Sequence, residues 1–567
     1  MKKFTHFKSI LTLTILCVAS FKASSQYTAA YSYGVDGRNE EVYGTGVDAQ
    51  GNYHIIGKYS NSTDTLLFNG QQLIELTVPF GSVDGLLWAK YDANDNLVFV
   101  KSFAAAKDTS ESGTLEDAKM AVSASGEVVI SGNYTHSLTI ENTTLTATQT
   151  GWGENNLFVA KFDNSGNLSW LKNIDTHGAT CMDIAFDQNG DVVFAGAFDQ
   201  DFDAGNSVSH SGSSSIDWGF LCRMAGTDGT AQALEIFEEG HPRNIDINGS
   251  GEIALIGFFD ENQMTFSDGT TLDIATPETN SNLKGNCFVS KFSSALAPVW
   301  ITQVRGNAMG TEDIYWANGG IKAMLNNTHY LAIGTDSIDT ETHAIANFDA
   351  SNGSVSSIVE CETFLFGMTS DGSKSYLSTQ QENGNNDLIF GTFTDNTVDK
   401  FILFEIDAND DVQWVESAGS FSANVEAKAM AIKGNTLIIG GDFRYGGVTL
   451  ATGITITPTA GFYEDAWFAK YKTSGGSSIA EAETTLVNLY PNPTNGTFTL
   501  DLNGLIATDL VIEILSINGQ RIYKSEALNQ ASILSIDALK NADNGLYLLH
   551  IKDQAGKVIQ TKKVVKL

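Results

Sequence analysis

The stretch that decides the fold is Leu157–Trp170, which reads LFVAKFDNSGNLSW. Its first six residues and the residues from Leu168 onward are rich in bulky apolar side chains, which suit β-strands. The segment between them, Asp163–Asn167, has turn chemistry, because Asp and Asn side chains bond the local backbone and Gly166 tolerates a positive φ. Two strands joined by a short glycine-containing loop predict a β-hairpin.

This hairpin returns in altered form along most of the chain. Copies begin at Leu86, Leu157, Phe220, Cys287, Phe401 and Trp467, with a weaker copy at Ala344. A second landmark, a turn followed by a strand that ends in glycine, recurs at Gly57, Gly132, Gly196, Gly257 and Gly440. Seven units of about sixty residues, each with four short strands, predict an all-β fold, a β-propeller of about seven four-stranded blades. Six or eight blades are alternatives, because residues 305–400 are degenerate.

The two ends of the repeat region complement each other. The last hairpin, which begins at Trp467, lacks its second strand, and Tyr27–Tyr33 resembles that strand. We therefore expect the N-terminal strand to complete the last blade and close the ring, which protects the sheet edges. Residues 27–475 resemble the loosely conserved propeller repeats of secreted bacterial surface proteins.

The N-terminus predicts export. Residues 1–25 combine a basic start, an apolar run at 10–19 that is too short to cross a bilayer comfortably, and small residues before a cleavage point. We expect a signal peptide over 1–25 and a mature start near Gln26, with a membrane anchor as the alternative. No other stretch resembles a membrane span.

The charge is concentrated in the repeat region. The formal net charge is −34, and residues 26–483 hold 21 basic and 60 acidic side chains. Such a body repels nucleic acid and anionic membranes. Solubility outside the cell is the simplest role of this charge, and divalent cations are the natural partners if a site uses it. The cysteines after the signal fit no metal-binding spacing, and we expect them to be buried free thiols: Cys181, Cys222, Cys287 and Cys361.

The C-terminal segment differs from the repeats. Residues 473–485 are small, polar and acidic, which predicts a linker between a body over 26–472 and a domain over 486–567. This domain contains seven short apolar segments, and Asn518-Gly519 is a strong tight-turn signal. The pattern predicts a small Ig-like β-sandwich.

Three motifs of this domain carry a resemblance to a known family. They are LYPNPTNGTFTLDL from Leu489, VIEILSINGQRIY from Val511 and NGLYLLHI from Asn544, followed by a basic tail that ends in KVVKL. Residues 486–567 thereby resemble the type A C-terminal sorting domain of the type IX secretion system of Bacteroidetes-type bacteria. An ordinary structural or sugar-binding sandwich is the alternative.

The resemblance implies an export route and a set of recognition residues. It implies passage through the periplasm and across the outer membrane, removal of the domain by a sortase-like peptidase, and surface anchoring or release. The residues that it assigns to recognition rather than catalysis are Pro491, Asn492, Pro493, Gly496, Gly519, Gly545 and Tyr547.

Signatures of catalysis and cofactor binding are scarce. The sequence contains no zinc-protease motif, P-loop, nucleophile elbow or dinucleotide fingerprint, so no cofactor is expected. Asp199, Asp201 and Asp203 with Gly205 resemble a calcium loop, but the glycine is displaced and the distal glutamate is missing. Calcium is therefore a weak candidate, and a surface turn is the alternative.

The loops that enter the first strand of each blade form the most suggestive column. Counting back from each turn aligns Glu41, Glu116, His241 and Glu426, with Thr180 at the third position and Trp316 nearby. Such a ring of carboxylates could hold a cation or sugar hydroxyls, the tryptophan could stack on a sugar, and paired carboxylates could act as acid and base. The alternative is that these are solvated loop charges.

Three functions fit these observations. The first is a non-catalytic secreted or cell-surface propeller that binds a glycan or a protein. The second is a carbohydrate-active enzyme, a hydrolase or lyase, at the acidic mouth, and the third is a purely structural surface component. The fold alone does not choose among them.

Overall fold

The computed structural model consists of strands and connecting turns, with no helix among the residues that it describes. These are residues 27–34, 39–60, 65–68, 72–75, 84–106, 113–148, 155–213, 216–259, 263–273, 286–306, 313–326, 331–334, 336–338, 343–381, 387–395, 398–419, 424–444, 446–451, 454–457, 463–473, 488–502, 510–516, 520–525, 533–552 and 558–567. The chain divides into two compact units, Met1–Thr473 and Ser474–Leu567. The predicted signal peptide, almost all of the predicted linker, and Gly519 lie outside the described residues.

In its described residues the first unit contains seven large sheets, numbered here by their first strands. Sheet 1 contains β2 (Glu41–Val47), β3 (Tyr53–Ser60), β6 (Asp84–Tyr91), β7 (Leu97–Ala106), β10 (Ser137–Ile140) and β11 (Thr143–Thr146). Sheet 2 contains β8 (Leu115–Val122), β9 (Val128–Tyr134), β12 (Asn156–Phe162), β13 (Leu168–Thr176), β16 (Asp201–Asp203) and β17 (Ser209–Ser211). Sheet 3 contains β14 (Thr180–Phe186), β15 (Val192–Phe198), β18 (Trp218–Met224), β19 (Ala231–Glu238), β22 (Gln263–Phe266) and β23 (Thr271–Asp273).

The remaining sheets follow the same plan. Sheet 4 contains β20 (His241–Ile247), β21 (Ile253–Phe259), β24 (Asn286–Phe292), β25 (Pro298–Gly306), β28 (Leu331–Ile333) and β29 (Asp336–Ile338). Sheet 5 contains β26 (Ile314–Ala317), β27 (Gly320–Asn326), β30 (His343–Phe348), β31 (Val355–Cys361), β34 (Leu388–Phe390) and β35 (Phe393–Asp395). Sheet 6 contains β32 (Leu365–Ser370), β33 (Ser375–Gln380), β36 (Phe401–Ile406) and β37 (Val412–Ala418). Sheet 7 contains β38 (Asn424–Lys433), β39 (Thr436–Arg444), β42 (Asp465–Lys472), β1 (Tyr27–Gly34), β4 (Thr65–Phe68) and β5 (Gln72–Glu75), and β40 (Val448–Ala451) pairs with β41 (Ile454–Ile456).

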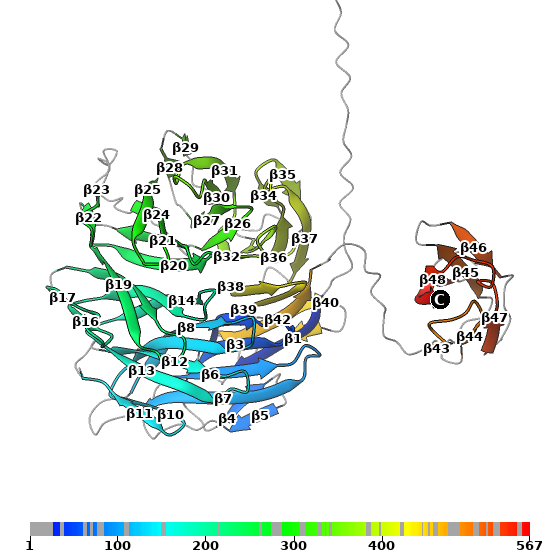
Figure 1. Ribbon diagram of the computed structural model, residues 1–567, viewed down its shortest axis with the longest axis horizontal. Coiled ribbons are helices and arrows are strands. Elements are labelled where there is room, and N and C mark those ends of the chain that lie inside the picture. Colours follow the sequence, from blue (N-terminus) through cyan, green and yellow to red (C-terminus); the bar gives the residue numbers. More distant parts are fainter. Residues whose placement is uncertain are drawn as a thin grey trace, which may run out of the picture. The chain divides into compact units, whose positions relative to one another are not determined.

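The first strands of the sheets contact one another in a circuit. Each of β2, β8, β14, β20, β26, β32 and β38 contacts the next, and β38 contacts β2. Figure 1 shows the labels of β8, β14, β20, β32 and β38 toward the middle of the first unit, and those of β5, β11, β17, β23 and β29 at its periphery. The first strands therefore surround a common centre.

The sheets are larger than the sequence predicts. Each repeat was expected to give four strands, yet six of the seven sheets contain six. The additional two strands come from a hairpin between the second and third strands of the next repeat. For example, β10 and β11 lie between β9 and β12 in the chain, but β10 pairs with β7 of sheet 1. This exchange links neighbouring sheets through hydrogen bonds.

The hairpin at Leu157–Trp170 is present, as β12 and β13. Asp163 accepts hydrogen bonds from the backbone N–H of Asn167 (2.8 Å) and from its Nδ2 (2.9 Å), and Gly166 has a φ of 85°. All seven residues of β12 are buried, because sheets cover both of its faces. A strand buried on both sides shows an apolar run instead of alternation, which explains the mixed pattern of its sequence.

A lysine in the third strand of the sheet, which is the first strand of this hairpin, joins neighbouring sheets. In four sheets its amine donates to a backbone carbonyl in the hairpin turn of the following sheet. The pairs are Lys90 Nζ to Asn164 O (2.5 Å), Lys161 Nζ to Gly226 O (2.9 Å), Lys291 Nζ to Ala350 O (3.2 Å) and Lys470 Nζ to Ala93 O (2.7 Å). The last pair links sheet 7 to sheet 1.

The N-terminal strand is the fourth strand of sheet 7. β1 pairs antiparallel with β42, and its register runs from Tyr27 opposite Tyr471 to Tyr33 opposite Ala466. Tyr27 and Tyr33 are both buried. The sequence prediction that the N-terminal strand completes the last repeat agrees with this pairing.

The second unit contains two sheets around one core. One sheet consists of β43 (Asn488–Tyr490), β44 (Phe498–Asp501) and β47 (Ile533–Ile536). The other consists of β45 (Val511–Ser516), β46 (Arg521–Lys524), β48 (Gly545–Lys552) and β49 (Val558–Lys566). Side chains of both sheets, among them Phe498 and Leu549, belong to a single hydrophobic cluster.

Candidate functional site

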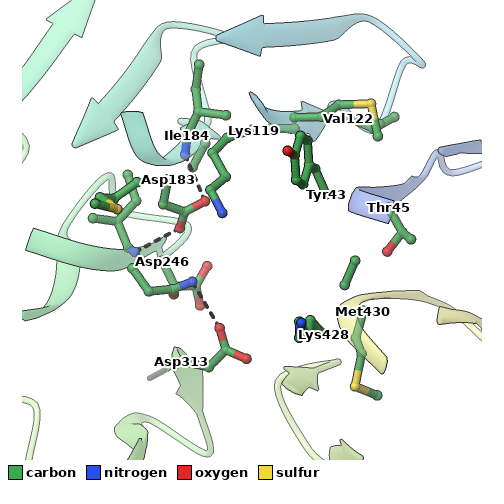
Figure 2. A pocket seen from close by; sticks show the side chains of 18 of the residues that line it. Tyr43, Thr45, Lys119, Val122, Asp183, Ile184, Asp246, Asp313, Lys428 and Met430 are labelled. Carbon is green, nitrogen blue, oxygen red and sulfur yellow. Dashed lines mark hydrogen bonds between the residues drawn. The ribbon is translucent and has the colours of Figure 1, made fainter. Parts of the chain in front are cut away.

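The first strands of the sheets enclose a cavity of about 730 Å³, here called the inner cavity. Residues of β2, β8, β14, β20, β26 and β38 line it, together with Asp313 just before β26. Figure 2 shows Asp183, Asp246 and Asp313 along one side, and Thr45 and Lys428 across from them. A cavity of this size can hold a small ligand.

Bulges in the first strands determine which side chains reach the inner cavity. The register slips by one residue near the start of four of the strands that line the cavity, leaving Tyr43, Met182, Arg243 and Lys428 without a partner across the strand pair. All four line the inner cavity. A bulge re-aims its side chain, so these residues point differently from what strict alternation gives.

Three cavity carboxylates are bound to backbone amides, and each reaches the next sheet. Asp183 accepts from the N–H of Ile245 in β20 (2.9 Å), and Asp246 accepts from the N–H of Trp316 in β26 (2.7 Å). Asp313 accepts from the N–H of Met368 in β32 (2.8 Å).

The second oxygen of each of these carboxylates is also occupied. The N–H of Ile184 donates to Asp183, the N–H of Ile247 donates to Asp246, and the Nδ2 of Asn244 donates to Asp313. The three aspartates therefore satisfy edge amides and hold sheets 3 to 6 together. Such bonds are valuable because an unpaired buried N–H costs free energy.

Burial makes these carboxylates easier to protonate than aspartates in water. Burial raises the pKa of Asp183 to about 6, and the backbone hydrogen bonds and the charge of Lys119 offset part of the effect. Burial likewise raises the pKa of Asp246 and of Asp313 to about 7. Both forms of the last two carboxyls are therefore populated near neutral pH.

Lys428 forms ion pairs with three carboxylates where sheet 7 meets sheet 1. Its Nζ lies 3.3 Å from Glu41, 3.0 Å from Glu426 and 3.2 Å from Asp442. Burial opposes the charge, but the carboxylates outweigh it and raise the pKa of Lys428 above its ordinary value. Because Glu41 belongs to β2 and Glu426 to β38, this cluster ties the first repeat to the last.

Two further cations of the inner cavity have no carboxylate partner among the described residues. Lys119 lies close enough to Asp183 and Asp313 to lower the pKa of both, but it makes no ion pair with a described side chain. The guanidinium of Arg243 contacts Met182 Sδ (3.6 Å) and lies 4.6 Å from the centre of the Phe258 ring.

The column predicted from sequence occupies equivalent positions in the strand pairs. The register places these residues opposite the residue that follows a glycine of the second strand, which is Gly441 in the last repeat. The pairs are Glu41 with Lys58, Glu116 with Asn133, Thr180 with Ala197, His241 with Phe258 and Glu426 with Asp442.

Only part of this column reaches the inner cavity. Glu41 lines it, and Glu426 touches it through Lys428. Glu116 is not among its lining residues. His241 stacks on the Phe258 ring at 4.7 Å. Trp316 donates through its backbone N–H to Asp246 Oδ2 and through its indole Nε1 to Asp246 O (3.1 Å), so it supports the sheet junction.

The aspartates of the weak calcium candidate lie at the start of the β16–β17 hairpin. Asp203 accepts from the N–H of Gly205 (2.8 Å), and Asp201 lies 3.9 Å from His177. Across the described residues, no group of three or more His, Cys, Asp or Glu side chains is arranged to hold a metal ion. Calcium binding by Asp199, Asp201 and Asp203 stays a prediction.

The sorting-motif residues join the start of the second unit to its last strand. Asn492 donates to Lys563 O (2.8 Å) and accepts from the N–H of Val565 (2.8 Å). Gly496 has a φ of 110°, and a Cβ there would lie 2.7 Å from the Cα of Lys540. The remaining described members are Pro491 and Pro493 in the same exposed turn, and Gly545 and the buried Tyr547 in β48.

Sequence reasoning missed four charged residues that line the inner cavity. They are Lys119, Asp183, Asp246 and Lys428. The predicted column of charges occupies equivalent positions in the strand pairs, but these four residues lie further along the chain, at or after the bulge or just beyond the first strand's start. No residue type in the sequence marks that bulge. A polar residue in an otherwise apolar first strand was the available signal, as at Asp183 in β14.

Comparison with known families identifies the second unit. Residues 488–566 match the family model of the secretion system C-terminal sorting domain. The chain therefore carries the sorting domain of the type IX secretion system, as its motifs predicted, and is a secreted or outer-membrane surface-attached protein. In the part of the chain that the structure describes, no helix is long and apolar enough to cross a membrane.

Comparison with individual proteins adds little about the first unit. Ulvan lyase NLR42 of Nonlabens ulvanivorans is 33% identical over 88 residues, which is 16% of this chain and 16% of the lyase. PorZ, a surface component of the type IX secretion system of Porphyromonas gingivalis, is 11% identical with a TM-score of 0.23, covering 93% of this chain and 81% of PorZ. The NanB sialidase of Streptococcus pneumoniae is 9% identical with a TM-score of 0.29, covering 80% of this chain and 69% of the sialidase. These likenesses carry no conclusion about activity.

Proposed function

We propose that this protein is an exported, non-catalytic binding protein whose first unit is a closed seven-bladed β-propeller that takes a glycan in its inner cavity. The observation that carries the proposal is the state of the cavity carboxylates. Both oxygens of Asp183, Asp246 and Asp313 accept hydrogen bonds. In each aspartate, one oxygen accepts its hydrogen bond from a backbone N–H of the next sheet. The three aspartates therefore form part of the cavity wall, and the cavity itself can take a ligand.

The closed propeller is supported by three independent contacts between the chain ends. β1 completes sheet 7, Lys428 joins Glu41 to Glu426, and Lys470 binds the turn of sheet 1 at Ala93. The circuit of contacts among the first strands has no gap. A ring of seven sheets follows if each sheet is counted as one blade.

A carbohydrate-active enzyme is the less favoured function. Hydrolysis of a glycoside by two carboxyl groups needs one protonated acid and one carboxylate free to act on water or on the sugar. Asp246 and Asp313 have raised pKa values, but their oxygens are committed to Trp316 and Met368. Glu41 is the remaining cavity carboxylate, and it is paired with Lys428.

For the second unit, we propose that the type IX machinery recognises residues 486–567 and that a sortase-like peptidase removes them. The linker 473–485 would supply the accessible chain for this cut. Deleting residues 484–567 is expected to leave the protein in the periplasm, as measured by fractionation. Appearance of the truncated chain in the medium or at the surface would overturn this export route.

The binding function is tested with the full mature chain on a glycan array, alongside a reducing-sugar and unsaturated-sugar assay on a broad polysaccharide panel. We expect saturable binding to a subset of glycans with no turnover. Turnover that is lost in Glu41→Gln would establish the enzyme instead. Neither binding nor turnover would favour a purely structural role at the surface.

A further inference from the structure

The inner cavity contains two cations that form no ion pair with its carboxylates. Lys119 of β8 and Arg243 of β20 lie on either side of β14, because β14 contacts both strands. Both side chains line the cavity. Among the described residues neither forms an ion pair with a carboxylate.

The nearest carboxylate does not take this role. Asp183 lies on β14 between the two cations, but its oxygens accept the N–H groups of Ile184 and Ile245 at 2.8 and 2.9 Å. Each oxygen of Asp183 thus already accepts one backbone N–H, and Lys119 acts on this carboxylate through space, lowering its pKa, without an ion pair. Lys428, by contrast, has three carboxylates within 3.3 Å.

The cavity wall also offers groups that suit sugar hydroxyls. Thr45 is buried, lines the cavity, and its Oγ1 has no hydrogen-bond partner among the described residues. A buried hydroxyl without a partner is costly, which indicates that a ligand or a water completes it. Figure 2 shows Thr45 and Tyr43 across the cavity from Asp183.

We propose that the inner cavity binds an anionic sugar residue, with Lys119 and Arg243 holding its carboxylate or sulfate group and Thr45 bonding a hydroxyl. This proposal rests on the proposed binding function and names its ligand class. Arg243 supplies a planar donor fork that matches such a group, and Lys119 supplies a point charge. The acidic surface of the body slows the approach of an anion, but beyond about 10 Å its charges are screened at 0.1 M salt, so the contacts inside decide the affinity.

The test is calorimetric titration of the full mature chain with three oligosaccharides of one backbone, ending in a neutral sugar, a uronate or a sulfated sugar. We expect one or both acidic ligands to bind and the neutral one to bind much more weakly. Lys119→Gln and Arg243→Gln should each weaken acidic binding by about 10-fold to 100-fold, since a hydrogen bond to a charged group is lost. Lys119→Arg should restore most of it, and Lys172→Gln, which removes a lysine of β13 outside the cavity, should change nothing.

The outcomes separate the two proposals. Equal binding of neutral and acidic ligands, unchanged in Lys119→Gln, overturns the anionic site and leaves glycan binding standing. Binding of no oligosaccharide in either series overturns both. Thermal unfolding of each variant is measured alongside, and loss of binding in a variant that unfolds with the wild type supports the site. If Lys119→Gln itself fails to fold, the Arg243→Gln and Lys119→Arg pair decides by the same criteria.

Discussion

Lys161 shows how one side chain can carry an inter-sheet contact. It is buried in β12, and its amine donates to Gly226 O and lies 3.0 Å from Glu127. A buried amine without partners would be costly, so the side chain is confined to a place where both acceptors are in reach. Trp170 Nε1 donates to the same carbonyl (3.1 Å), so the turn of sheet 3 is held from two directions.

Replacing Lys161 with methionine tests this contact. Methionine keeps the stem of the side chain but removes the donor, and Gly226 O retains its bond from Trp170. We therefore expect the free energy of unfolding to fall by about 1 kcal/mol, the net value of one hydrogen bond, as measured by urea titration. Lys172→Met in the neighbouring strand is the control. An unchanged urea midpoint for Lys161→Met would show that the hydrogen bond from Lys161 to Gly226 O adds nothing to stability.

Asp246 gives the body a pH-dependent stability. Its pKa is about 7 in the folded chain, against an ordinary value near 4, because it is buried. Between these values the folded chain binds more protons than the unfolded chain, so this group makes stability fall as pH rises from about 4 to about 7. Asp183, Asp313 and Asp442 act in the same direction. His54, whose pKa burial lowers to about 3, acts in the opposite direction.

Asp246→Asn isolates one of these contributions. The amide offers one acceptor oxygen where the carboxylate offered two, so one of the bonds from Ile247 and Trp316 is lost and stability should fall by about 1–3 kcal/mol. In addition, the slope of unfolding free energy against pH between 4 and 7 should be less negative than in the wild type. Urea titrations at several pH values measure both effects.

Asp349→Asn is the control. Hydrogen bonds lower the pKa of that exposed carboxyl, so its effect on stability lies below about pH 4. Parallel pH curves for wild type and Asp246→Asn would contradict the assignment.

At the scale of the element, the hairpin was predictable and the bulge was not. The turn at Asp163–Asn167 has local chemistry that the sequence displays. A bulge depends on how a strand meets its neighbours around the inner cavity, so Tyr43 and Arg243 carry no local mark of it. The same reasoning applies to the β10–β11 hairpin, which pairs with β7 and not with its own repeat.

The turn at residues 491–496, near the start of the second unit, contacts parts of that unit that are distant in sequence. Gly496 has a positive φ and lies against the backbone of Lys540. Thr494, two residues earlier, exchanges backbone hydrogen bonds with Val565 and Leu567 at the C-terminus. The turn, the β47–β48 connection and the last strand therefore fold as one piece.

Gly496→Val should disrupt this piece. The side chain would clash with Lys540 and strain the backbone, a combination that typically costs more than about 2 kcal/mol. Because the sorting domain must be recognised for export, we expect the variant to accumulate in the periplasm. Immunoblots of periplasm, surface and medium measure this, with the exposed Asn495→Ala as the matched control. Normal export of Gly496→Val would separate the fold of this turn from sorting.

At the scale of the molecule, the ends of the repeat region determine the architecture. The missing strand after Lys472 and the additional strand at Tyr27 were visible in the sequence as a mismatch of repeats. Their pairing is long-range, and it follows from the unpaired edge that each would otherwise expose. The inner cavity itself was not predictable, because it arises from six first strands that are far apart in the chain and share only a register.

Moving the N-terminal strand tests closure directly. Deleting residues 27–34 removes two buried tyrosines and uncovers the edge of β42. Truncating one large aromatic side chain in a core costs about 3–5 kcal/mol, so the deletion should cost more and replace cooperative unfolding with a broad transition and dye binding to exposed apolar surface. A second chain has the same deletion but carries DNSGNYTAAYSYG directly after Tyr471, so that the turn sequence of residues 163–167 separates Tyr471 from Tyr27 as it separates Phe162 from Leu168. There the strand reaches β42 as an ordinary hairpin, as β13 reaches β12, and cooperative unfolding should return. If the deletion leaves the transition intact, β1 does not close the ring. If the deletion is harmful but the relocated strand fails to restore folding, the N-terminus contributes something besides the pairing with β42.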